Sequence, residues 1–239
     1  MENQICNCEN CHHQLCASRV PIFSTMDAGE LNRIVSLIIR RQYIKGELII
    51  LEGSDLQGLI IINRGQVKVF RGTLEGREQI LYIFSEGDFF GERNLFRDEK
   101  ARYSVETLEN TNICMIKKND FQKLLREYPD IGIKIMEELV IRLGHLENAI
   151  ESMGSKNVEA RVGSVLLEFA GRYGKEHQKG IIVELPLSRE GIANYIGLAR
   201  ETVSRKMSVL QDEGIIEMVG NKKIIIIDKE ALEKSIEQI

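Results

Sequence analysis

A long stretch near the centre of the chain places an apolar residue at every third or fourth position. It follows a break at Pro129 and is expected to form one helix over residues 130–154. The apolar stripe of this helix is roughly six turns long, which favours the seam of a two-chain coiled coil over a helix packed only on its own domain. Residues 130–154 are therefore predicted to be a dimerisation helix, with its interface at Ile135, Leu139, Leu143, Leu146 and Ile150.

Before this helix, the period shortens to β-branched runs separated by glycines. A short amphipathic helix, capped by Asp27, comes first and extends to about residue 40. The strands predicted after it are 47–51, 58–63, 66–71, 79–84, 104–107 and 112–116. Because the turns between them are closely spaced, we expect a small antiparallel barrel or roll. This β domain is assigned to residues 19–129.

The last third of the chain returns to the helical period and contains two short helices joined by a glycine. Ser188 is expected to cap the first, which runs to Tyr195, and Gly197 supplies the turn before the second. The other expected elements are a helix at 158–172, a polar loop at 174–180, a strand at 181–185, the second short helix at 200–213 and a β-wing at 222–227. Residues 155–239 are therefore predicted to form a winged helix-turn-helix domain, and the chain is placed in the α+β class.

The second short helix carries the residues expected to read DNA. Four polar side chains, Arg200, Glu201, Ser204 and Arg205, share one face near its start, while its apolar residues take the opposite face. Arginine can bond guanine bidentately, glutamate can accept from cytosine, and serine can meet either kind of base edge. Lys206 is expected to contact the phosphate backbone. The alternative is a solvated helix face in a winged module that binds protein.

Composition narrows the classes of protein that this chain can be. With 239 residues and 43% apolar content it can bury more than one core, so two domains are expected. It has no run of about 18 apolar residues and no signal-peptide pattern, which predicts a cytoplasmic protein without a membrane partner. A net charge of −4 argues against bulk electrostatic binding of nucleic acid, so any DNA contact must come from a local patch. No phosphate loop or nucleophile elbow is visible, and an enzyme is not expected.

Four of the five cysteines crowd into a polar arm, residues 1–18, that has no apolar periodicity of its own. They are Cys6, Cys8, Cys11 and Cys16, and the fifth, Cys114, lies in the β domain. In a reducing compartment such cysteines are more often metal ligands or redox sensors than structural disulfides, and four thiolates are what an iron-sulfur cluster requires. Two alternatives remain open: zinc, with His12 or His13 joining the thiolates, and a redox disulfide without metal.

With these motifs in place, nearly the whole chain resembles the CRP/FNR family of bacterial transcription regulators. That family combines a jelly-roll domain of the cyclic-nucleotide-binding type, a long dimerisation helix and a winged helix-turn-helix. The segment Cys8-Glu-Asn-Cys11-His-His-Gln-Leu-Cys16, the lone Cys114 and the segment Glu201-Thr-Val-Ser204-Arg205 resemble the oxygen-sensing FNR branch. The resemblance implies a [4Fe-4S] cluster held by Cys8, Cys11, Cys16 and Cys114, with Cys6 as the substitute for Cys8.

The same resemblance implies partners and a mechanism. It implies a homodimer that binds double-stranded DNA at a palindromic promoter site with TTGAT-like half-sites, read by Glu201, Ser204 and Arg205, and works with RNA polymerase. Arg200 resembles the arginine at the same place in CRP. Cluster assembly would close a loop of about a hundred residues and pin the arm, and loss of the cluster to oxygen would free it.

The chain departs from the FNR pattern at two places. The gap between Cys11 and Cys16 is one residue shorter than the usual spacing, and apolar Leu146 stands where switching FNR proteins carry an acidic residue in the helix seam. Removing like-charge repulsion there should strengthen pairing, so we expect a dimer that persists when the cluster is lost.

A CRP-like regulator that responds to a small ligand is the alternative function. Gly91 and Glu92, followed by Arg102 and Ser104, partly resemble the phosphate-binding segment of CRP. A buried arginine for a phosphate and a glutamate for a ribose are what such a site needs.

Overall fold

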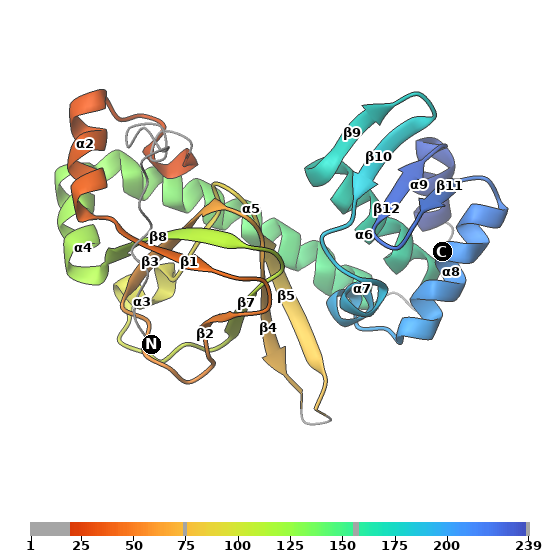
Figure 1. Ribbon diagram of the computed structural model, residues 1–239, viewed down its shortest axis with the longest axis horizontal. Coiled ribbons are helices and arrows are strands. Elements are labelled where there is room, and N and C mark those ends of the chain that lie inside the picture. The colour runs from red at the N-terminus through yellow and green to blue at the C-terminus, as the bar shows by residue number, and fades with distance from the viewer. Residues whose placement is uncertain (1–19, 74–75, 155–157, 238–239) are drawn as a thin grey trace. The chain divides into compact units, whose positions relative to one another are not determined.

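The computed structural model describes residues 20–73, 76–154 and 158–237 (Figure 1). Contacts between Cα atoms divide the chain into two units. The β unit comprises residues up to Arg71 together with Leu81–Leu143, and the C-terminal unit comprises Gly72–Ile80 and Gly144–Ile239.

The β unit is an antiparallel jelly roll of two four-stranded sheets, as the sequence predicted. The first sheet has the order β1-β8-β3-β6 and consists of β1 (Ile39–Tyr43), β8 (Thr111–Lys117), β3 (Gly58–Arg64) and β6 (Phe89–Phe90). The second has the order β2-β7-β4-β5 and consists of β2 (Leu48–Ile50), β7 (Ser104–Thr107), β4 (Val67–Gly72) and β5 (Glu78–Phe84). All six predicted strands are present. The strands β1 and β6 were not predicted.

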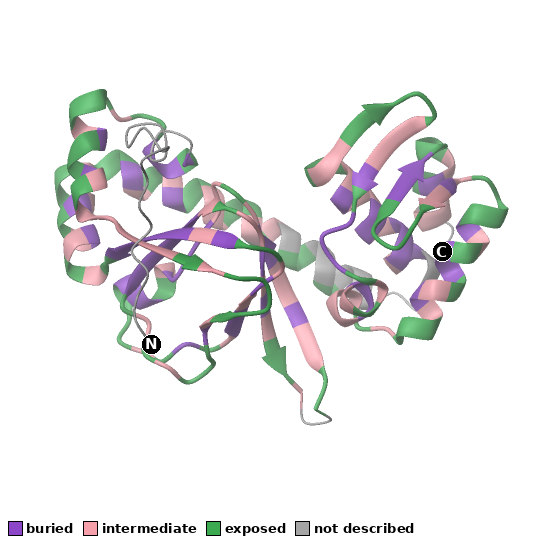
Figure 2. Cartoon of the chain, in the orientation of Figure 1, coloured by how far each residue is buried: buried purple, intermediate pink, exposed green. Residues whose placement is uncertain are grey.

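The two central strands of the first sheet, β8 and β3, are buried on both faces, which explains their almost continuous apolar runs (Figure 2). Alternate residues of β8 point to different cores. Ile113 and Met115 belong to the inner core between the two sheets. Cys114 and Ile116 belong to the outer core, between the first sheet and the helices that cover it.

The covering helices are the 3-10 helix η1 (Pro21–Phe23), α2 (Ala28–Leu37), α3 (Glu92–Phe96), α4 (Lys118–Glu127) and α5 (Pro129–Gly154). Asp27 caps α2 as expected: its carboxylate accepts from the N–H of Glu30, and the Glu30 carboxylate accepts from the N–H of Asp27, both at 2.9 Å. Proline is favoured in the first turn of a helix, so α5 begins at Pro129 itself.

The C-terminal unit is a winged helix-turn-helix. Its helices are α6 (Val158–Tyr173), α7 (Arg189–Ile196), α8 (Arg200–Asp212) and α9 (Lys229–Glu237). Its sheet has the order β11-β12-β10-β9, formed by β11 (Ile216–Val219), β12 (Lys223–Ile226), β10 (Gly180–Glu184) and β9 (Gly174–His177). The polar loop expected at 174–180 is therefore wrong. Its first residues form β9, an exposed edge strand whose polar residues show no alternation but pair with β10.

Candidate nucleic-acid interface and sensor thiol

A serine cap, a glycine turn and backbone hydrogen bonds determine the geometry of the junction between α7 and α8. The Ser188 hydroxyl accepts from the N–H of Gly191 at 3.2 Å and caps α7, as predicted. Gly197 ends the helix with a φ of 69°, a left-handed conformation that glycine adopts without steric cost. The N–H of Leu198 donates to the Ala193 carbonyl at 2.9 Å, and the Ala199 carbonyl accepts the first bonds of α8. The turn therefore sets where α8 starts.

The first two turns of α8 present polar side chains to the surface. Val203, Met207 and Leu210 are buried in the domain core. On the other side, Arg200, Glu201 and Arg205 are exposed and Ser204 is partly exposed, so the structure brings the four predicted reading residues onto one accessible face. We call these four residues the α8 face.

Lys206 does not share the α8 face. Its side chain is buried, with 7% of its surface exposed, because it stands three residues after Val203 and four before Leu210 on the helix. The sequence analysis expected Lys206 to contact the phosphate backbone. As placed, the side chain offers little accessible surface for such a contact.

The wing adds two exposed cations that the predicted site did not include. Lys222 lies in the turn before β12, where Gly220 has a φ of 67°, and Lys223 is the first residue of β12. Lys223 is 3.9 Å from the Glu184 carboxylate, a surface pair of little energetic weight. The charge of these lysines was visible in the sequence, but their exposure follows from the hairpin.

The helix α5 divides the predicted interface residues between two environments. Ile135 is buried in the outer core and Leu139 packs against that core. Leu143, Leu146 and Ile150 are exposed. The structure therefore places Ile135 inside its own domain, away from a partner chain.

Four further exposed apolar residues on α5, Ile133, Met136, Val140 and Ile141, were not included in the prediction. The first three continue the spacing of Leu143, Leu146 and Ile150, with a step of three or four residues from each member to the next. Their spacing could have identified them, but the prediction followed the stripe that begins with Ile135 and Leu139, and these two residues pack on their own domain. The six residues Ile133, Met136, Val140, Leu143, Leu146 and Ile150 are called the free face of α5.

Cys114 is buried, with 5% of its surface exposed, and lies in the outer core. Val20, Ile22 and Phe23, the first described residues after the cysteine-rich arm, belong to the same core. Cys6, Cys8, Cys11 and Cys16, together with His12 and His13, lie outside the described residues. Within the described ranges, no three His, Cys, Asp or Glu side chains are grouped as metal ligands would be.

Cys114 is the one proposed cluster ligand that lies among the described residues, and its chemistry is compatible with an iron-sulfur cluster. Thiolates are the ligands that such clusters require, and Cys114 offers one on the side of the first sheet where the chain emerges from the arm. Cys16 lies four residues before Val20, and four extended residues span at most about 14 Å. The described residues thus fit a shared ligand set without fixing its geometry.

The residues suggested for a small ligand are not arranged as a phosphate site. The Arg102 side chain is exposed and donates to the Glu99 carboxylate at 2.9 Å. The Ser104 hydroxyl is buried and accepts from the N–H of Glu52 at 3.0 Å. Glu92 pairs instead with Arg142 of α5, their charged groups 3.7 Å apart.

The partly buried tyrosines Tyr103 and Tyr195 have raised pKa values. Burial raises the pKa of Tyr103 well above its ordinary value, and the nearby Glu92 carboxylate adds to the rise. In the C-terminal unit, burial likewise raises the pKa of Tyr195, whose hydroxyl donates to the Glu168 carboxylate at 2.9 Å. Both phenols are neutral at physiological pH, and that of Tyr195 acts as a structural donor.

Comparison with protein families assigns both halves of the chain. Residues 40–128 match the model of the cyclic nucleotide-binding domain, and residues 160–235 match that of the Crp-like helix-turn-helix domain. Among the parts of the chain that the structure describes, none of the helices is long and apolar enough to cross a membrane.

Individual relatives extend over nearly the full length. The chain is 31% identical over 209 residues to electron transport regulator A of Shewanella oneidensis, covering 87% of this chain and 83% of that protein. It is 27% identical over 220 residues to the anaerobic regulatory protein of Bacillus subtilis, covering 91% and 92%. The solved structure of FixK2 from Bradyrhizobium japonicum superposes with a TM-score of 0.71 at 26% identity, covering 82% of this chain and 96% of that one.

Proposed function

The chain belongs to the CRP/FNR family of DNA-binding transcription regulators, which are dimers and not enzymes, and we propose that it senses oxygen or redox state through an N-terminal [4Fe-4S] cluster. The proposed ligands are Cys8, Cys11, Cys16 and Cys114, with Cys6 as the substitute for Cys8. One observation carries the proposal: Cys114 lies in the same core as Val20, only four residues beyond the last cysteine of the arm.

The thiolates on the arm and on β8 would link two parts of the chain that are about a hundred residues apart. When bound, such a cluster supplies sensitivity to oxygen through its exposed iron and sulfide. The chain's own contribution is mechanical. Shared ligation would tie the arm to the outer core, which also holds the start of α5, and loss of the ligation would release it.

DNA reading is proposed for the α8 face. Glu201, Ser204 and Arg205, with Arg200 beside them, would contact base edges in the major groove of a palindromic site with TTGAT-like half-sites. Two copies related by a two-fold axis would place two α8 helices on successive half-sites, and RNA polymerase is the proposed partner at promoters. Exposure of three of these side chains and partial exposure of Ser204 support the proposal.

The names of two relatives agree with a link to respiration. One relative is named for the regulation of electron transport and another for anaerobic regulation. Both names are consistent with regulation by oxygen.

A small-ligand regulator is the second candidate, because residues 40–128 match the cyclic nucleotide-binding domain. The exposed side chain of Arg102 and its pairing with Glu99 weigh against it. Zinc binding and a metal-free thiol switch are further alternatives to the cluster, since both would use the same cysteines.

The test is an ultraviolet-visible spectrum with iron and sulfide analysis on protein prepared without air. We expect a brown protein with about four iron atoms per chain, bleached by air, and a colourless Cys114→Ser variant of unchanged helix content. Met115→Leu, on the inner-core side of the same strand, is the control and should keep the colour. A colourless wild type that contains zinc or no metal would overturn the proposal.

We further propose that the dimer persists when the cluster is lost, because Leu146 on α5 is apolar and adds no like-charge repulsion to the seam. Sedimentation of metal-free protein at micromolar concentration should show a dimer. A monomer under these conditions would contradict this prediction.

A further inference from the structure

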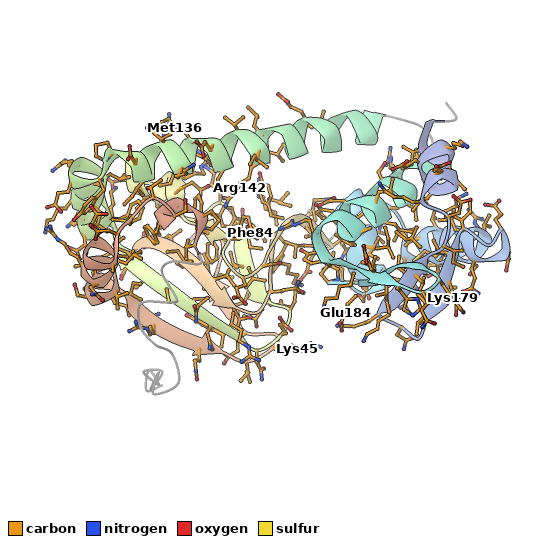
Figure 3. The ribbon with its side chains drawn as sticks, turned by 90° about the horizontal axis from the view of Figure 1, so that it is seen from above. Lys45, Phe84, Met136, Arg142, Lys179 and Glu184 are labelled. Atoms are coloured by element: carbon orange, nitrogen blue, oxygen red, sulfur yellow. The ribbon has the colours of Figure 1, made fainter. Side chains whose placement is uncertain are left out.

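One charged side chain lies on the otherwise apolar buried side of α5. Ile131, Ile135 and Arg142 are separated by four and seven residues, so they lie on one side of the helix. The first two are buried in the outer core, and the side chain of Arg142 is only 14% exposed. Figure 3 shows Arg142 and Phe84 on the β-domain side of α5, with Met136 on the other side.

The guanidinium of Arg142 makes four contacts, all with the β unit. Its Nη2 donates to the Phe89 carbonyl at 2.6 Å. Its Cζ lies 4.6 Å from the ring centroid of Phe84 and 4.5 Å from that of Phe89. Its Nη1 is 3.7 Å from Oε2 of Glu92. The contacts come from β5, β6 and α3, so one side chain joins α5 to three elements of the roll.

The contact with Glu92 compensates a buried charge. The Glu92 side chain is 16% exposed, and within the described part of the chain its buried Oε2 atom has no hydrogen-bond partner. Its position is fixed by Gly91, which has a φ of 93° and on which a Cβ would come within 2.6 Å of the Gly58 carbonyl oxygen. Without Arg142, this carboxylate would be left buried without its cation.

Arg142 also stands at the end of the β unit. That unit ends on α5 at Leu143, the next residue along the chain and a member of the free face of α5. Apolar packing is not directional, so Ile131 and Ile135 hold α5 against the β unit without strictly fixing its rotation about its own axis. A hydrogen bond and an ion pair to fixed groups depend on direction, and they select one rotational setting.

We propose that Arg142 is a positioning residue for dimerisation: it fixes the rotation of α5 on the β unit, so that the free face is presented to a second copy of the chain. The inference rests on the proposed homodimer. Register is the best attested use of a buried charged group in helix pairing, and here the group acts from the side of the helix that its own domain covers.

Sedimentation velocity of the full-length, anaerobically prepared protein tests the proposal with Arg142→Gln. We expect the dimer dissociation constant to rise about tenfold or more, with helix content unchanged. Lys134→Gln is the matched control: it removes one positive charge from the same helix, where Lys134 makes only a surface pair with Glu137 at 2.8 Å, and it should dimerise like wild type.

Two further variants separate positioning from general destabilisation. Arg142→Lys keeps the charge and should recover part of the loss. Combining Glu92→Gln with Arg142→Gln removes the carboxylate left without its cation, so the double variant should regain stability. Without the ion pair that sets the rotation of α5, its dimer should remain weaker than that of the wild type. These two variants also decide the question if Arg142→Gln fails to fold.

The outcomes distinguish this inference from the function it rests on. A wild type that sediments as a monomer at micromolar concentration would sink the homodimer itself. A wild-type dimer with an equally tight Arg142→Gln dimer would contradict only the role of Arg142, as would a folded double variant that dimerises like the wild type.

Discussion

The helices α5 and α8 each bury one apolar stripe in their own domain, but the sides that they leave free are chemically opposite. On α5 the free face is apolar, with Met136, Val140 and Leu143 among its members. On α8 it carries Arg200, Glu201 and Arg205. The buried stripes anchor the helices, whereas the free sides indicate the partner: another apolar surface for α5 and DNA for α8.

The largest effect is expected from placing a charge on the free face of α5. Leu143→Asp would bury two carboxylates at a two-fold contact, and it should weaken the dimer by about a hundredfold or more. Sedimentation equilibrium measures the change. Ile141→Asp, the same kind of change at an exposed residue of α5 outside the free face, should leave the dimer intact. Equal losses in both variants would show that the free face is not the interface.

A smaller effect is expected on α8. Replacing Arg205 by Ala should cost about 1 to 3 kcal/mol of DNA binding and relax the choice at one base pair. A gel-shift series with single-base changes in the half-site measures both. Arg205→Lys keeps the charge but loses the bidentate fork, so specificity should fall while salt dependence is retained. Wild-type binding by Arg205→Ala would remove it from the reading face.

The smallest effect on DNA binding is expected at Lys206. A phosphate contact would make Lys206→Ala weaken binding to every sequence and lower the salt slope by about one. Because the side chain is buried, we expect instead an unchanged salt slope and a loss of about 1 kcal/mol in the free energy of unfolding. Thermal denaturation and binding at several salt concentrations measure the two quantities. A reduced slope would return Lys206 to the interface.

Periodicity in the sequence was sufficient to predict the order and type of most helices and strands. It was not sufficient to predict which side of each helix is buried. The strands β3 and β8 were predictable because their β-branched runs are continuous, and they are continuous because both faces of these two strands are buried. The edge strand β9 and the short helix α3 carry no comparable signal, since one is polar and exposed and the other is only five residues long.

The sequence does not show which sides of α5 and α8 their own domains cover. Ile135 was predicted at the interface because it lies four residues before Leu139 in the apolar stripe, and Lys206 was predicted to contact the phosphate backbone; the structure buries both side chains. On α5, two apolar stripes run next to each other, and only the tertiary structure shows which one the β unit covers. The contact of Arg142 with Glu92 joins residues fifty positions apart, and local periodicity carries no signal for such a pair.

The central claim, that the cysteines control the DNA-reading helices, is tested most directly by fluorescence anisotropy on a duplex with two TTGAT-like half-sites. Protein prepared without air should bind at least about tenfold more tightly than the same protein after air, and Cys114→Ser should bind weakly in both states. Equal affinity of the wild type before and after air would contradict the account.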